Sequence, residues 1–104
     1  MGRLVYNSSF EVDFDDRLLA HLKIVIGAKL GRDEGFFFSW KDTLEVGNGR
    51  TTLWMHPTIP LRFTFLTGAT PPINAEWVRR LIAESHGGTG LRISPEVPPV
   101  TVAG

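Results

Sequence analysis

The segment GFFFSWKDTLEVGNGRTTLWMHPTIPLRFTF, residues 35–65, decides the fold class of this chain. Polar and apolar side chains alternate in three stretches of it, which begin at Phe36, Thr51 and Leu61, and such alternation is typical of β-strands. The links between the stretches are too short for crossover helices, so we expect three antiparallel strands. Between the first two, the Gly-Asn-Gly sequence at 47–49 predicts a hairpin turn, because glycine permits positive φ.

Two further segments have the apolar spacing of three to four residues that is typical of helices with one buried side. Residues 13–35 contain the first helix, which begins at an aspartate cap, either Asp13 or Asp15. Residues 69–90 contain the second helix, for which Asn74 is the expected N-cap. Both helices are followed by glycine, which favours a stop.

Short segments at both ends complete the expected fold. Residues 3–6 predict an opening strand followed by a turn at 7–9, and residues 91–93 predict a last short strand. The order is therefore β-α-β-β-β-α(-β), an α+β fold with a single antiparallel sheet of three to five strands and two helices packed on one face. We expect residues 1–94 to form one domain and the proline-rich residues 95–104 to form an extended tail.

The composition restricts the functions open to this chain of 104 residues. Eleven Lys and Arg balance eleven Asp and Glu, whereas general nucleic-acid binders have a basic excess, so such a role needs a local patch. The absence of cysteine excludes disulfides, thiolate metal sites and thiol nucleophiles. No signal-peptide stretch opens the sequence and no apolar run nears the ~20 residues of a membrane span, so we expect a cytoplasmic, soluble protein with no membrane contact.

A cluster near the predicted hairpin is the strongest candidate binding site. Its members are aromatic or cationic side chains, which can stack on a nucleobase or meet a phosphate. They are Trp40, Lys41, Arg50, Trp54, His56 and Arg62, with Asp42 beside them. The alternative interpretation is a hairpin tip with charged flanks and no ligand.

The sequence predicts no catalytic residue, no metal and no cofactor. The three histidines lack the His-x-x-x-His spacing of a helical metal site. Asp13, Asp15 and Asp16 do not follow the pattern of a calcium loop, and helix capping explains them. No serine lies in a Gly-x-Ser-x-Gly motif, and the glycine-rich loop after residue 86 follows a helix rather than preceding one, so no helix N-terminus meets a phosphate there.

The hairpin segment, together with VDFDDRLLAHLKIVIGAKLGRDEG at 12–35 and INAEWVRRLI at 73–82, resembles a small actinobacterial family of uncharacterised proteins of about this length. The resemblance covers nearly the whole chain, and members of that family are commonly labelled "ATP-dependent DNA ligase". An adenylating ligase needs a lysine nucleophile in a Lys-x-Asp-Gly motif. Lys23, Lys29 and Lys41 all lie outside such a motif, and the chain is too short for a nucleotidyltransferase domain.

We therefore expect a non-catalytic binding module that acts through an aromatic-rich face of the sheet. If both helices cover one face, Phe37, Trp54 and Leu66 must be covered by something else or remain exposed, and exposed apolar patches commonly mark interfaces. Self-association through this face is the first expectation. The alternative, which the ligase label of the resembling family implies, is an accessory protein that binds nucleic acid or nucleotide during DNA ligation or repair.

Overall fold

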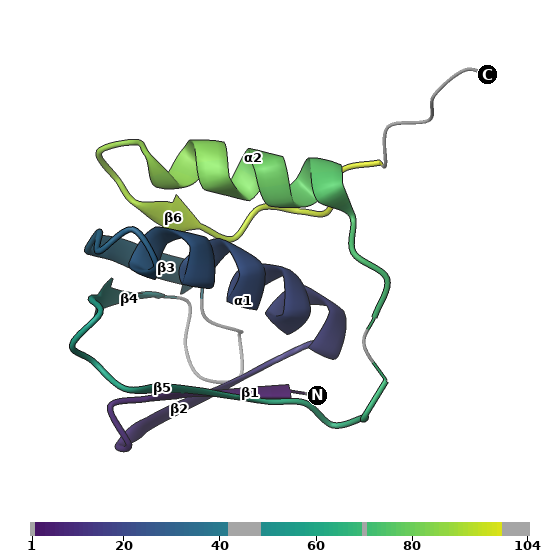
Figure 1. The fold of residues 1–104 in the computed structure, drawn as a ribbon, viewed down its shortest axis with the longest axis horizontal. Coiled ribbons are helices and arrows are strands. Elements are labelled where there is room, and N and C mark those ends of the chain that lie inside the picture. The colour runs from purple at the N-terminus through teal and green to yellow at the C-terminus, as the bar shows by residue number, and fades with distance from the viewer. Residues whose placement is uncertain (1, 42–48, 70, 99–104) are drawn as a thin grey trace.

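The computed structural model describes residues 2–41, 49–69 and 71–98, which form an α+β fold of two helices and two three-stranded sheets (Figure 1). In chain order the elements are β1 (Gly2–Tyr6), β2 (Phe10–Phe14), α1 (Asp16–Leu30), β3 (Phe36–Lys41), β4 (Arg50–Met55), β5 (Leu61–Thr64), α2 (Ala75–Ser85) and β6 (Leu91–Arg92). The order predicted from the sequence lacks β2. This strand has only five residues and is followed directly by Asp15, the N-cap of α1, so it was not distinguished from the segment that enters the helix.

The first sheet has the strand order β2-β1-β5, and both of its strand pairs are antiparallel. β1 and β2 form a hairpin in which Tyr6 lies opposite Phe10. Asn7 and Ser8 have φ values of 53° and 60° in its turn, a region that asparagine tolerates better than most residues. The predicted turn at residues 7–9 is confirmed.

The second sheet has the strand order β4-β3-β6. β3 and β4 are antiparallel over all six residues of each strand, which confirms the predicted pair. β6 lies parallel to β3, with Phe38 opposite Leu91. Gly47 and Asn48, which were predicted to form the hairpin turn, lie outside the described residues.

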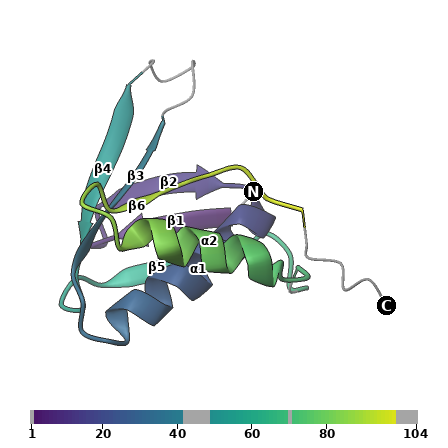
Figure 2. The ribbon, with the colours of Figure 1, turned by 90° about the horizontal axis from the view of Figure 1, so that it is seen from above.

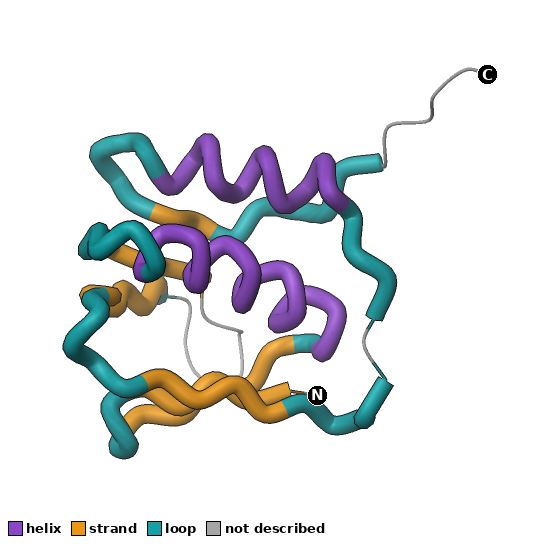
Figure 3. Tube along the Cα trace, in the orientation of Figure 1, coloured by secondary structure: helices purple, strands orange, loops and turns teal. Residues whose placement is uncertain are grey.

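The prediction of a single antiparallel sheet is wrong, because β5 leaves β4 and pairs with β1 instead. Figure 3 shows the two resulting groups of strands. The link from β4 to β5 contains Pro57 and Pro60, which have no N–H to donate to a neighbouring strand. A turn closed by the Ile59 N–H (3.0 Å) redirects the chain, and the Pro60 carbonyl then accepts from the N–H of Asn7, next to β1 (2.9 Å).

The core lies between the helices and the inner faces of both sheets. In Figure 1, α1 runs between α2 and the first sheet. Fully buried side chains come from both helices and from both sheets, and include Leu4, Leu22, Ile26, Phe38, Met55, Leu81 and Leu91. Figure 2 shows β3 and β4 extending beyond both helices. Within the described ranges, neither helix is long and apolar enough to cross a lipid bilayer.

Aromatic ring contacts and a hydrogen bond join the sheets directly. Phe14 of β2 packs edge-on against Trp40 of β3, with ring centres 5.4 Å apart. The Tyr6 hydroxyl, at the end of β1, donates a hydrogen bond to the backbone carbonyl of Trp54 in β4 (2.6 Å). The two sheets are therefore tied together even though they share no strand.

His21 links the two helices inside the core, where it is fully buried. Its Nδ1 donates to the carbonyl of Arg17 (2.6 Å), and its Nε2 accepts from the backbone N–H of Asn74 (2.8 Å), so both ring nitrogens are satisfied. Asn74 is the N-cap of α2, as predicted, because its side chain accepts from the backbone N–H groups of Glu76 and Trp77.

The segment after β6 returns across the starts of both helices. The Glu96 carboxylate accepts two hydrogen bonds from the Arg17 guanidinium (2.8 and 2.5 Å) and one from Asn74 Nδ2 (2.9 Å). These bonds, the Arg17 contact first, lower the pKa of Glu96 to about 2. Val97 also accepts from Asn74 through its carbonyl (2.7 Å). The domain boundary at residue 94 stays a prediction, and the described part of the predicted tail contacts the helices.

Candidate functional site

Three rows of side chains cross the outward-facing side of the second sheet, which we call the outer face. Residues that lie opposite each other on paired strands share a side, so the strand register assigns the members of each row. The rows are Trp54 with Phe37, Thr52 with Ser39 and Arg92, and Arg50 with Lys41. The first and third rows are four residues apart along each strand, or about 13 Å. The outer face thus has an aromatic end and a cationic end.

The aromatic end is half exposed and supported from below. Phe37 is 49% exposed and Trp54 is 44% exposed, and their rings meet edge to face with centres 5.0 Å apart. His56 stacks with Trp54 at 6.2 Å, with 22° between the ring planes. A Cβ on Gly35 would lie 2.7 Å from the Trp54 ring, so glycine is what permits the ring to lie this close to the chain. The result is a preformed aromatic surface that is open to a planar group.

Lys41, Arg50 and Arg92 give the outer face a local positive charge, although the whole chain has a formal net charge of zero. All three side chains are exposed. Arg50 donates through Nη1 to the hydroxyl of Ser39 (3.3 Å). In the part of the chain that the structure describes, none of the three cations pairs with a carboxylate. Unpaired cations on one face favour an anionic partner.

The structure brings four of the six residues predicted from the sequence together. Lys41, Arg50 and Trp54 lie on the outer face, and His56 stacks with Trp54. These residues belong to β3 and β4 or directly follow β4, so the hairpin alone places them. Asp42, which was predicted beside them, lies outside the described residues.

The other two predicted residues lie elsewhere. Trp40 points to the opposite side of β3 from Trp54, where it is 7% exposed and packs against Phe38 with ring centres 5.1 Å apart. The Trp40 side chain therefore belongs to the core and does not reach the outer face. Arg62 lies on β5 in the first sheet, opposite Val5 of β1, and so on a different sheet from Trp54.

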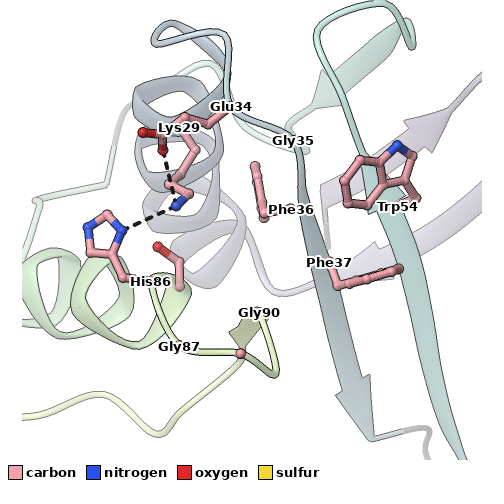
Figure 4. A pocket seen from close by; sticks show the side chains of 11 residues that line it. Lys29, Glu34, Gly35, Phe36, Phe37, Trp54, His86, Gly87 and Gly90 are labelled. Atoms are coloured by element: carbon pink, nitrogen blue, oxygen red, sulfur yellow. Dashed lines mark hydrogen bonds and ion pairs between the residues drawn. The ribbon is translucent and has the colours of Figure 1, made fainter.

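A pocket of about 380 Å³ adjoins the aromatic end of the outer face. Phe37 and Trp54 line it from the second sheet, and residues 85–88 with Gly90 line it from the end of α2 and the loop that follows. Lys29, near the end of α1, completes the wall (Figure 4). The pocket and the outer face therefore share their two aromatic side chains.

Lys29, Glu34 and His86 form a polar group across the start of β3 from Trp54 (Figure 4). The Lys29 side chain is 9% exposed, and its Nζ lies 3.2 Å from Glu34 Oε2 and 3.3 Å from His86 Nδ1. The same Nζ lies 5.7 Å from the centre of the Phe36 ring. An ammonium group only donates, so His86 Nδ1 accepts and Nε2 carries the ring proton.

Sequence reasoning missed this polar group and also missed Arg92. Lys29 and Glu34 lie close together in the sequence, but their spacing matches no motif, and only the tertiary fold brings in His86, 57 residues beyond Lys29. Residues 91–93 were predicted as a strand, but the parallel pairing that places Arg92 beside Ser39 depends on a contact across 53 residues of sequence.

The outer face and the pocket together offer several kinds of non-covalent contact. They include aromatic stacking, cations, the exposed hydroxyl of Thr52 and a partly enclosed pocket. Across residues 2–41, 49–69 and 71–98, no group of three or more His, Asp or Glu side chains could hold a metal ion. Stacking and phosphate pairing are the interactions through which proteins hold single-stranded nucleic acids.

Comparison with known proteins gives a family but no activity. The family described as "Domain of unknown function (DUF7882)" matches residues 1–96. No curated protein and no solved structure matches the chain, so no named relative supports the ligase label of the proteins that the sequence resembles. Since the match spans nearly all of the 104 residues, the chain belongs to the DUF7882 family.

Proposed function

We propose that this protein is a non-catalytic module that binds single-stranded nucleic acid across the outer face of its second sheet. The observation that carries the proposal is the combination of the exposed Phe37–Trp54 pair with three cations that pair with no carboxylate among the described residues. A role beside a DNA-processing enzyme, which the label of the resembling family suggests, fits such a module. The missing Lys-x-Asp-Gly motif favours an accessory role over ligase catalysis.

The two ends of the outer face suit the two chemical parts of a nucleotide chain. A base stacked on an aromatic side chain is worth about 1–3 kcal/mol and needs no particular sequence. Lys41, Arg50 and Arg92 then meet phosphates, and three such contacts predict that log K falls with log salt at a slope of about −2 for a single strand. The exposed hydroxyl of Thr52, in the middle row, adds a hydrogen-bonding group between the two ends, whereas Ser39 is buried there.

A second copy of this chain is a weaker candidate for the same face. In a twofold dimer the same patch lies on both sides of the interface, so two surfaces that each carry Lys41, Arg50 and Arg92 would approach each other. Like charges across an interface oppose association. We therefore keep self-association through this face as an outcome of the experiment below.

The test measures binding of a fluorescein-labelled (dT)10 strand by anisotropy and by quenching of tryptophan fluorescence, at several salt concentrations. We expect Trp54→Ala to weaken binding by about 5- to 150-fold, as the loss of one stacked base predicts. Arg50→Ala is expected to reduce the salt slope by about 0.7. Arg62→Ala is the matched control, because it removes an exposed arginine from the first sheet and should change neither quantity.

Three results would contradict the proposal. The first is the absence of binding and quenching at low salt. The second is a wild-type protein that sediments as a dimer and becomes monomeric in the Trp54→Ala variant, since the outer face would then be occupied by a second copy. The third is an equal effect of the Arg50 and Arg62 substitutions on binding, which would mean that the outer face is not the binding surface.

A further inference from the structure

We propose that the pocket beside the aromatic end receives one nucleobase of the bound strand, and that the edge of this base forms hydrogen bonds with Glu34 and His86. This inference rests on the proposed function, and it identifies the place where the protein contacts a single base of the strand. The pocket is continuous with the outer face, because Phe37 and Trp54 line both. A strand stacked on Trp54 therefore has its neighbouring base at the mouth of the pocket.

The size of the pocket favours a single base. Its volume of about 380 Å³ lies at the lower end of the range for small-molecule sites. Gly90 helps to shape it: its φ is +78°, and a Cβ there would come within 2.3 Å of the Phe37 carbonyl oxygen. The loop after α2 can therefore lie against β3 and close one side of the pocket.

The polar wall of the pocket offers both kinds of hydrogen-bonding group. Nδ1 of His86 accepts a hydrogen bond from Lys29. The ring N–H at Nε2 therefore remains as a donor, and the His86 side chain is exposed. Glu34 uses Oε2 in its ion pair with Lys29, which leaves Oε1 as an acceptor without a partner in the described part of the chain. Every base has an edge that combines a hydrogen-bond donor with an acceptor.

The charge of this wall also favours a base over a phosphate. The ammonium of Lys29 is already compensated by the Glu34 carboxylate at 3.2 Å and lies over the Phe36 ring at 5.7 Å. A carboxylate at the pocket wall repels an anion. The phosphates have better ionic partners in Lys41, Arg50 and Arg92, which have no carboxylate partner among the described residues.

The experiment follows the backbone amide resonances of Gly87, Gly88 and Gly90 in the full chain during titration with AMP and, separately, with ribose 5-phosphate. We expect AMP to shift these resonances and ribose 5-phosphate to leave them unchanged. His86→Ala and Glu34→Ala should each weaken AMP binding by about 3- to 10-fold, as the loss of one hydrogen bond predicts. Arg79→Ala, an exposed change on α2 outside the pocket, is the matched control.

The outcomes separate this inference from the proposed function. If ribose 5-phosphate shifts the same amides as AMP does, the pocket takes a sugar phosphate and the inference is wrong. If (dT)10 binds but AMP moves none of these resonances, the pocket is not a base site, while the outer face remains the binding surface. If AMP enters the pocket but (dT)10 does not bind, the proposed function fails and the base site stands alone. The comparison of the two ligands on wild-type protein remains decisive even if a variant fails to fold.

Discussion

At the scale of single residues, Gly90 sets the path of the chain into β6. Its φ of +78° lies in a region that side chains rarely adopt, and the space where a Cβ would sit is filled by the backbone of Phe37. Glycine alone meets both conditions. Because of this residue, β6 can lie parallel to β3 and bring Arg92 to the outer face.

Gly90→Ala should therefore destabilise the protein, by about 1–2 kcal/mol from the left-handed backbone alone and by more from the contact with Phe37. A decrease of roughly 4–8 °C in Tm per kcal/mol is expected for a domain of this size. Gly88→Ala is the control in the same loop, because a Cβ there would meet nothing within 4 Å. Thermal unfolding followed by circular dichroism measures both variants, and equal Tm values would contradict the role given to Gly90.

At the scale of elements, what could be predicted from the sequence was local. Asn74 caps α2 as predicted, since a cap depends on contacts within one helical turn. The pairing of β5 with β1 could not be predicted, because alternation shows which side chains share a face but not which strand lies beside them. The candidate site divides in the same way: Arg50 and Trp54 come from one hairpin, whereas Arg92 depends on tertiary structure.

The contact between the helices gives an element-scale prediction. His21→Leu still fills the core with a side chain but leaves the backbone N–H of Asn74 buried without its acceptor, which costs about 1–3 kcal/mol. Urea unfolding should show a lower midpoint with an unchanged slope. Lys23→Ala, on the exposed side of α1, should leave the midpoint close to that of the wild type. An unchanged midpoint in His21→Leu would mean that this hydrogen bond does not hold the helices together.

At the scale of the whole molecule, the segment after β6 joins parts of the chain that are far apart in sequence. Glu96 binds Arg17 at the start of α1 and Asn74 at the start of α2. Together with the bond between Tyr6 and Trp54, this contact makes two helices and two separate sheets into one unit.

The lowered pKa of Glu96 makes part of the stability dependent on pH. Its pKa in the folded protein is about 2, against an ordinary value of 4.5, so its stabilising contribution is present above pH 4.5 and is lost as the pH falls through about 2. We expect wild type to be more stable than Glu96→Gln at pH 7 and this difference to shrink toward pH 2. Urea midpoints of both proteins across this range measure the difference. A difference in urea midpoint between the two proteins that stays constant with pH would mean that the ionised carboxylate of Glu96 is not the cause of this difference.

The hydrogen bond between Tyr6 and the Trp54 carbonyl has a practical consequence. Tyr6 is the single tyrosine of the chain, and its hydroxyl contacts the backbone of the residue that carries the exposed indole ring. Incorporation of fluorotyrosine would place one fluorine nucleus at the junction of the two sheets and leave the surface of the outer face unaltered. The protein thus contains a natural position for a single spectroscopic label, one hydrogen bond away from the aromatic surface and outside it.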